Sequence, residues 1–199
     1  MQKNLQISRT HVKLIIMTKP TFFVEEDKIL ATLFEEGMDN LHLCKPGAEP
    51  VYSERLLTLL PEDYMGRITV HEHFYLKQEF RLRGIHLDSP QTPVPKGYRG
   101  NYSITCHSVD ELKEAKKRAS YVFLDTPIEE LEVLGGHHQI DKKVYSSANI
   151  NMGNMNTVKE LGFGGVVICE DLWSQFDIHS QQDYKSLLLH FSKLRKAVG

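Results

Sequence analysis

Short β-branched runs alternate with helical patterns along almost the whole chain, and this alternation constrains the fold more than any other feature. The helical pattern is clear at 25–36, where Ile29, Leu30 and Leu33 share one face and Gly37 provides a stop. Strict alternation of strand and helix implies a parallel sheet, and about eight such units favour a closed barrel. We therefore predict an α/β fold, a single-domain (β/α)8 TIM barrel with parallel strands.

The expected barrel occupies residues 12–199, behind a flexible leader at 1–11 that is polar and has no periodicity. The chain has 199 residues, fewer than the ~250 typical of this fold, so its loops must be tight. A longer loop is expected at 88–101, which contains three prolines. Strands are expected at 12–17, 40–44, 67–71, 84–87, 102–106, 121–124, 143–146 and 166–169, and helices at 25–36, 53–60, 74–80, from 108 onward, 126–134, 154–161 and around 184–194.

Charge and cysteine content exclude several classes of protein. The net charge of −2 gives no electrostatic case for nucleic acid or for an anionic membrane surface. The apolar run 14–17 is far too short for a signal sequence or a membrane span. Cys44, Cys106 and Cys169 include no C-x-x-C pair, which argues against a disulfide framework and favours a reducing cytoplasm. Their simplest role is as small core residues.

Polar and titratable residues follow most of the expected strands. In a barrel of this kind the active site lies at the carboxyl ends of the strands, so these residues are expected to share one rim. The candidates are His42, Cys44, Lys45, His71, Glu72, His73, His86, Asp88, Cys106, His107, Ser108, Asp125, Thr126, Ser147, Ala148, Asn149, Cys169, Glu170 and Asp171.

Each candidate has a simpler structural alternative. His107 is either a general acid or base or a hydrogen-bonded histidine of the rim. His71 and His73, two residues apart on an expected strand, could bind zinc, but the sequence dictates no third ligand. Lys45 is either a phosphate ligand or a solvated surface lysine.

Helix capping explains a second group of rim residues. Ser108 is followed three residues later by Glu111, the pattern of a capping box. Asp125 and Thr126 precede Pro127, which suits the first turn of a helix. These residues are therefore expected to act as caps first.

Several blocks of the sequence, taken together, resemble a known family. They are LHLCKP at 41–46, VHEHFYLK at 70–77, GIHL at 84–87, CHS at 106–108, YVFL at 121–124 and the segment 161–173. From about Lys13 to Arg195, in order and with similar spacing, the chain resembles the thiamine phosphate synthase/TenI family, and most closely the short forms of Bacteroides-type bacteria.

The resemblance implies a thiamine-biosynthesis barrel with one of two activities. Synthases of this family join a pyrimidine pyrophosphate to a thiazole phosphate and release pyrophosphate, with magnesium. TenI-like members bind the thiazole phosphate and in some cases tautomerise it to the aromatic form, with a histidine as base and no metal cofactor.

The family's site residues carry over by position. Lys45 would meet the pyrophosphate, and His42 belongs to the same substrate-binding segment. Glu72 and, more approximately, Asp88 would hold magnesium. His107 matches the TenI-type catalytic histidine, with Glu72 assisting.

Further positions depart from the family pattern. Cys44 stands where an arginine is expected. The loop between the expected strand at 121–124 and the next helix is shortened to Asp125 and Thr126, without the lysine that synthases carry there. Ala148 and Asn149 replace a glycine pair that cradles the thiazole phosphate, although Asn tolerates unusual backbone dihedrals. Glu170 replaces a small residue near the same phosphate, and repulsion of a dianion there would cost a few kcal/mol.

Three hypotheses follow. The first is a TenI-like protein that binds or tautomerises a thiazole phosphate with His107 as base. The second is a non-catalytic ligand-binding or regulatory relative, and the third is a synthase with a reorganised pyrophosphate site. If the trimmed loop leaves the barrel open beside the sixth strand, exposed apolar surface there would favour a homodimer.

Overall fold

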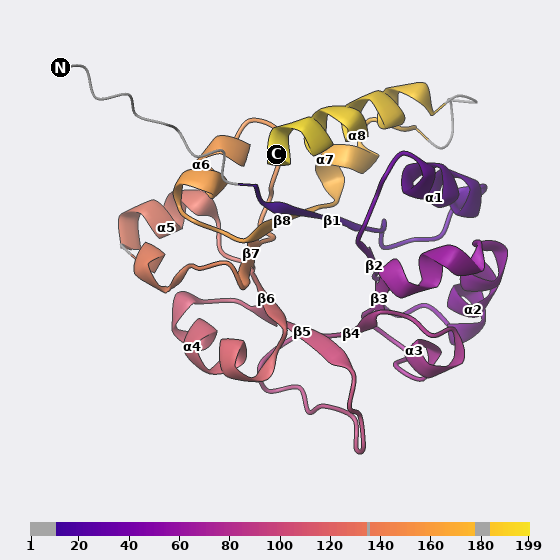
Figure 1. The fold of residues 1–199 in the computed structure, drawn as a ribbon, viewed down its shortest axis with the longest axis horizontal. Helices are drawn as coiled ribbons and strands as arrows, with labels where there is room; N and C mark the ends of the chain where they lie inside the picture. Colours follow the sequence, from indigo (N-terminus) through magenta and orange to yellow (C-terminus); the bar gives the residue numbers. More distant parts are fainter. Residues whose placement is uncertain (1–10, 135, 178–183) are drawn as a thin grey trace.

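In a computed structural model, which describes residues 11–134, 136–177 and 184–199, the strands close into one barrel (Figure 1). Each strand is parallel to its neighbours, and β8 closes the barrel by pairing with β1 from Lys13↔Gly165 to Ile16↔Ile168. The predicted parallel (β/α)8 barrel is confirmed, whereas the predicted leader falls almost entirely outside the described residues. The strands are β1 (Lys13–Met17), β2 (Leu41–Leu43), β3 (Ile68–Val70), β4 (Gly84–Leu87), β5 (Asn101–Cys106), β6 (Tyr121–Leu124), β7 (Val144–Ser146) and β8 (Gly165–Ile168).

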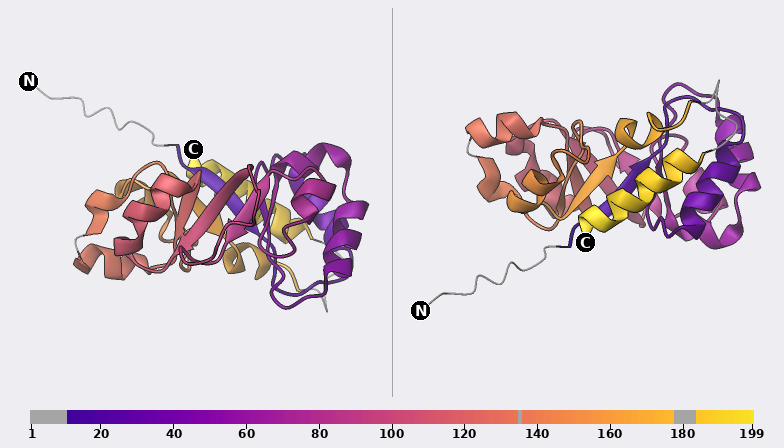
Figure 2. Two further views of the ribbon diagram at one scale, coloured as in Figure 1. Left: turned by 90° about the horizontal axis from the view of Figure 1, so that it is seen from below. Right: turned by 90° about the horizontal axis from the view of Figure 1, so that it is seen from above.

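Helices surround the barrel in the order that the sequence predicts, and α8 packs on β1 (Figures 1 and 2). The α-helices are α1 (Glu26–Glu35), α2 (Pro50–Leu59), α3 (Leu76–Glu79), α4 (Val109–Arg118), α5 (Ile128–Leu134), α6 (Met155–Glu160), α7 (Glu170–Trp173) and α8 (Lys185–Val198). Two 3₁₀ helices, η1 (Glu62–Arg67) and η2 (Gly136–Gln139), and the short α7 were not predicted. No helix in the described part of the chain is long and apolar enough to cross a membrane.

The two predicted helix caps form differently from their sequence patterns. Ser108 occupies the N-cap of α4, but its side chain makes no capping hydrogen bond. The Glu111 carboxylate accepts instead from the main-chain N–H of His107, at 2.8 Å. The Thr126 hydroxyl donates to the His107 carbonyl at 3.3 Å rather than accepting from the start of α5. Both bonds tie the start of a helix to the segment that follows β5.

The shortened loop after β6 does not open the barrel. β6 pairs with β7 from Val122↔Val144 to Leu124↔Ser146, and the main-chain N–H of Ser147 extends the pairing by donating to Leu124. The argument for a homodimer through an open barrel therefore does not apply, because β6 and β7 are paired.

The inside of the barrel has an apolar half and a polar half. Ile15, Phe123, Tyr145 and Val167, from β1 and β6 to β8, form a small apolar cluster separate from the main core between strands and helices. The polar half comes from β2 to β6. Its members are His42, His71, His86, Ser103, Thr105 and Tyr121, which are joined by hydrogen bonds.

Candidate active site

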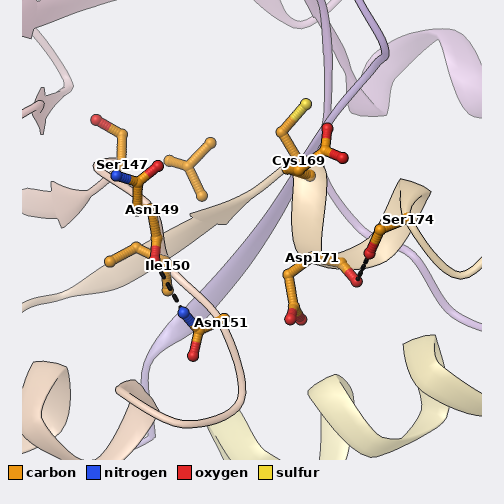
Figure 3. Close-up of a pocket in the computed structure, with 9 residues that line it drawn as sticks. Ser147, Asn149, Ile150, Asn151, Cys169, Asp171 and Ser174 are labelled. Carbon is orange, nitrogen blue, oxygen red and sulfur yellow. Dashed lines mark hydrogen bonds between the residues drawn. The ribbon is translucent and has the colours of Figure 1, made fainter.

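A cavity of about 330 Å³ lies at the carboxyl ends of β7 and β8 (Figure 3). This is the small end of the size range of ligand pockets. One wall comes from the segment after β7 and the other from the end of β8 and from α7. The lining residues are Ser147, Asn149, Ile150, Asn151, Val167, Cys169, Glu170, Asp171 and Ser174.

The wall after β7 offers hydrogen-bond donors that are not used within the protein. The main-chain N–H groups of Ala148, Asn149 and Ile150 donate to no other described residue, and the buried Ser147 hydroxyl has no partner. Asn149 has φ 51°, the left-handed conformation that glycine adopts freely and that Asn tolerates. Its carbonyl accepts from the Asn151 and Asn154 side-chain amides. The loop therefore keeps a glycine-like shape that suits an anion.

The opposite wall carries two carboxylates in different states. Asp171 accepts from the His190 Nε2 at 2.6 Å. The Glu170 side chain is exposed, and its carboxylate has no hydrogen bond or ion pair with the described residues. Trp173 anchors α7, because its indole N–H donates to the Met17 carbonyl at 2.7 Å. Glu170 thus lines the cavity, but its side chain is exposed, so water screens its charge.

Glu72, which follows β3, is bound to the segment after β2. One oxygen accepts from the Lys45 main-chain N–H at 3.0 Å, and the other lies 3.9 Å from the Cys44 thiol. Burial raises the pKa of the Glu72 carboxyl. Burial and the neighbouring Glu72 raise the pKa of the Cys44 thiol to about 12. Cys44 is therefore a neutral thiol that donates to Glu72, where the family resemblance expects a cation.

The Lys45 side chain is buried beneath the segment that joins β1 to α1. Its ammonium lies 2.6 Å from the Glu26 carboxylate, 3.1 Å from the Thr21 carbonyl and 4.5 Å from the centre of the Phe22 ring. Lys45 is 1% exposed and Glu26 2%. The ammonium is fully occupied, so the pyrophosphate role predicted for Lys45 would require it to leave Glu26.

His107 lies on the rim after β5. Its Nδ1 is 3.7 Å from the Asp125 carboxylate, which follows β6, and both side chains are about half exposed. Asp125 therefore lies beside the ring, at a separation longer than a hydrogen bond. The solvated Nε2 is left available to a ligand above the barrel.

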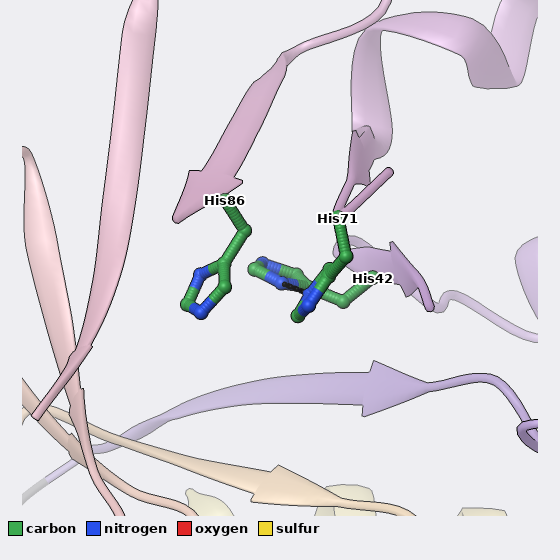
Figure 4. Close-up of side chains that lie close together, drawn as sticks. All are labelled: His42, His71 and His86. Atoms are coloured by element: carbon green, nitrogen blue, oxygen red, sulfur yellow. Dashed lines mark hydrogen bonds between the residues drawn. The ribbon is translucent and has the colours of Figure 1, made fainter. Parts of the chain in front are cut away.

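The inner histidines form a cluster that sequence spacing did not reveal (Figure 4). The Nδ1 of His42 lies 2.9 Å from the Nε2 of His71, and the rings of His71 and His86 stack at 4.2 Å. Burial lowers the pKa of all three, that of His71 to about 3, so the rings are neutral. Because β3 ends at Val70, His71 and His73 do not share a strand face as their spacing suggested: the His73 ring bonds to the Ala48 carbonyl.

Comparison with known proteins identifies the family of this chain. The chain matches no family model and no curated protein sequence. It is 50% identical to thiamine phosphate pyrophosphorylase from Bacteroides thetaiotaomicron, whose crystal structure superposes with a TM-score of 0.86 over 94% of this chain and 97% of that one. The chain belongs to the thiamine phosphate pyrophosphorylase family. This confirms the predicted resemblance and makes the protein a thiamine-biosynthesis barrel.

More distant structures share the fold alone with this member of the thiamine phosphate pyrophosphorylase family. Thiamine phosphate pyrophosphorylase from Pyrococcus furiosus is 18% identical, with a TM-score of 0.71 over 96% of each chain. A 3-hexulose-6-phosphate synthase is 10% identical, with a TM-score of 0.64 over 94% of this chain and all of the other. Their likeness reports the barrel and not its chemistry.

The residues predicted to bind magnesium follow adjacent strands, β3 and β4. Asp88 accepts from the Thr92 hydroxyl, and both Glu72 oxygens are already in use. No third histidine, cysteine or carboxylate joins these two residues among the described residues. Magnesium is commonly held by one or two carboxylates together with substrate phosphates and water, so the pair fits it. The predicted site residues of this member of the thiamine phosphate pyrophosphorylase family thus lie in separate places. Some are at the rim, but His42 lies inside the barrel and the Lys45 ammonium is buried against Glu26.

Proposed function

We propose that the chain binds a thiazole phosphate in the cavity between β7 and β8 and catalyses its tautomerisation. The observation that carries this proposal is the set of unused donors along one wall: the Ser147 hydroxyl and the main-chain N–H groups of Ala148, Asn149 and Ile150. Backbone N–H groups without an internal acceptor can bind phosphate without a cation. The exposed Glu170 weakens the site but does not fill it.

His107 is the proposed base. The ends of β5 and β7 are two strand spacings apart, about 10 Å, which a thiazole ring held by its phosphate at β7 can bridge. A neutral His107 ring accepts the proton, and Asp125 at 3.7 Å from Nδ1 stabilises the imidazolium. Tautomerisation moves one proton between two positions of the thiazole, so nothing else enters or leaves. Glu72, a carboxyl whose pKa burial raises, is the proposed assisting group.

Synthase activity is the second candidate, and the relative at 50% identity supports it. Magnesium held by Glu72 and Asp88 would neutralise the pyrophosphate in that reaction. The arrangement of cations favours the first candidate, because Cys44 is a neutral thiol and the Lys45 ammonium is paired with Glu26. Pyrophosphate transfer depends strongly on charge neutralisation.

Calorimetry with thiazole phosphate, followed by a tautomerisation assay, tests the proposal. We expect micromolar binding and conversion to the aromatic tautomer. Ser147→Ala should weaken binding about tenfold, since a hydrogen bond to a charged group contributes ~1.5 kcal/mol. His107→Gln should keep binding and abolish conversion, whereas His73→Gln, with its ring bound to Ala48, is the matched control.

The outcomes separate the three hypotheses. Binding without conversion by the wild type would indicate a non-catalytic binder. Formation of thiamine phosphate with release of pyrophosphate, when pyrimidine pyrophosphate and magnesium are added, would indicate a synthase. Absence of binding, even in Glu170→Gly, would contradict the proposed phosphate site.

A further inference from the structure

Three histidine rings converge inside the barrel (Figure 4), and none of them lines the cavity at the ends of β7 and β8. His42 comes from β2, His71 from the position after β3 and His86 from β4. One ring nitrogen of each lies within 4.8 Å of the others. We propose that His42, His71 and His86 form a binding site for a single divalent transition-metal ion of the zinc type.

The ring nitrogens are close enough to share an ion, but the stacked rings of His71 and His86, 4.2 Å and 23° apart, must turn out of their stack to direct a nitrogen at it. Zinc–nitrogen bonds of ~2.0–2.1 Å place tetrahedral ligand nitrogens about 3.4 Å apart. The His42 Nδ1 and His71 Nε2 are already 2.9 Å apart, which is slightly closer. The His86 nitrogen must approach by at most about 1.4 Å from the 4.8 Å limit, which requires the ring to give up one of its two hydrogen bonds, to Ser103 or to Thr105.

The residues around the cluster supply the hydrogen bonds that histidine ligands require. A histidine that binds a metal through one nitrogen usually donates its other N–H to a partner, which fixes the ring. The His42 Nε2 lies 2.8 Å from the Tyr121 hydroxyl. The two His86 nitrogens lie 2.7 Å and 2.8 Å from the Ser103 and Thr105 hydroxyls, so either hydroxyl can hold the ring while the other nitrogen binds.

Metal binding requires no net release of protons. In the metal-free network one proton lies between His42 and His71. If it belongs to His42, ligation moves it to Nε2, where the Tyr121 oxygen accepts it, because a hydroxyl can donate or accept. If it belongs to His71, it moves to the Nδ1 of that ring. No carboxylate is hydrogen-bonded to the three rings, so each is the neutral imidazole that binds transition metals.

The thiols at the mouth of the barrel are the main competing ligands. Cys44 and Cys169 are half-buried and are close enough for a charge on Cys169 to affect the pKa of Cys44. Burial raises the pKa of both, and thiols bind these metals only as thiolates. An imidazole site and a thiolate site are also distinguishable, because thiolate ligation adds a sulfur-to-metal charge-transfer absorption.

Cobalt titration of the full-length protein, first stripped of metal by a chelator, tests the site. We expect one Co²⁺ per chain with visible tetrahedral absorption and no thiolate charge transfer, and displacement by Zn²⁺. His71→Asn and His86→Gln should each weaken binding more than about 100-fold, because loss of an outer partner alone costs 10–100-fold. Tyr121→Phe should weaken it about tenfold by the same reasoning.

Controls and a second measurement keep the proposal falsifiable. His73→Gln and the pair Cys44→Ser with Cys169→Ser should bind cobalt as the wild type does. Zn²⁺ should raise the melting temperature of the wild type and not that of His71→Asn. This variant is chosen because His71 is partly exposed, so its replacement leaves the buried His42 in place. Absence of stoichiometric binding by the wild type, or binding that survives His71→Asn and is lost with the cysteines, would overturn the proposal.

Discussion

Substitution of Glu26 by leucine would leave the Lys45 ammonium buried beside the start of α1 without its carboxylate. The two groups are 2.6 Å apart and are 2% and 1% exposed. The Thr21 carbonyl and the Phe22 ring would be the remaining contacts, and neither carries a charge. Removal of one member of a buried pair typically costs ~3–5 kcal/mol, because the other charge stays in a low-dielectric site.

A double-mutant cycle measures this coupling. Glu26→Leu should lower the free energy of unfolding by about 3–5 kcal/mol, which for a chain of this size is a shift of ~1–2 M in the urea midpoint. Lys45→Met should cost less, since the carboxyl can take up a proton. The double variant should be within ~1–2 kcal/mol of the wild type, because no buried charge remains. Circular dichroism follows the transition.

An exposed ion pair at the same helix provides the control. Glu25 and Lys28 lie 2.5 Å apart but are 52% and 64% exposed, so Glu25→Gln should cost less than ~1 kcal/mol. A cost below ~1 kcal/mol for Glu26→Leu would refute the reasoning. That result would mean that the Lys45 ammonium reaches water, where it would be available to a substrate phosphate.

Three further changes test other parts of the structure. Acidification should destabilise the protein below pH 6.5. Desolvation lowers the pKa of His71 to about 3 and also lowers those of His42 and His86, so the unfolded chain binds more protons. Above pH 6.5 the free energy of unfolding keeps its full value, and below it falls by ~1.4 kcal/mol per pH unit for each histidine. Urea midpoints at pH 7.5, 6 and 5 measure this fall. His71→Asn should remove about a third of the dependence of stability on pH. Glu170→Gln should tighten the binding of inorganic phosphate about tenfold at low salt, because a dianion ~6 Å from an exposed carboxylate is repelled by ~1.4 kcal/mol in a nearly aqueous dielectric. Calorimetry should show that high salt removes this gain. An unchanged affinity at low salt would mean that the anion binds elsewhere. Asn149→Val should lower the stability measured by thermal unfolding by ~1–2 kcal/mol, because the φ angle of this residue is 51°. Asn149→Gly should stay near the wild type. Equal losses for both variants would show that side-chain contacts, and not the backbone conformation, determine stability at this position.

The barrel was predictable from the sequence because each unit repeats one simple pattern. β4 (Gly84–Leu87) and β6 (Tyr121–Leu124) have the predicted bounds, since turn residues flank each apolar run. Helix α7 (Glu170–Trp173) was missed because four residues are too few to show a helical period. That omission mattered, since α7 forms one wall of the cavity.

The candidate site was only partly predictable, because its contacts join residues far apart in the chain. Ala148, Asn149 and Glu170 were expected near one phosphate, and Asn149 and Glu170 do line one cavity with Ala148 between Ser147 and Asn149. The burial of Lys45 depends on Glu26, which lies one helix earlier. Sequence position assigned Lys45 to the rim, but a strand end does not determine which way a long side chain turns.

The histidine cluster shows a second limit of sequence reasoning. His42 and His71 are separated by 29 positions, and only the pairing of β2 with β3 brings them together. The spacing of His71 and His73 suggested a shared face, which required a strand that continues past Val70. The register between strands, and not the period within one strand, selects the rings that meet.

Trp173 is the single tryptophan of the sequence, and it is 1% exposed. It ends the short helix whose first residues, Glu170 and Asp171, line the cavity at the ends of β7 and β8, and its indole is bonded to the last residue of β1. A ligand that shifts α7 must therefore alter the surroundings of this one indole. The protein carries its own optical reporter, so its tryptophan emission should follow occupancy of the cavity without any added label.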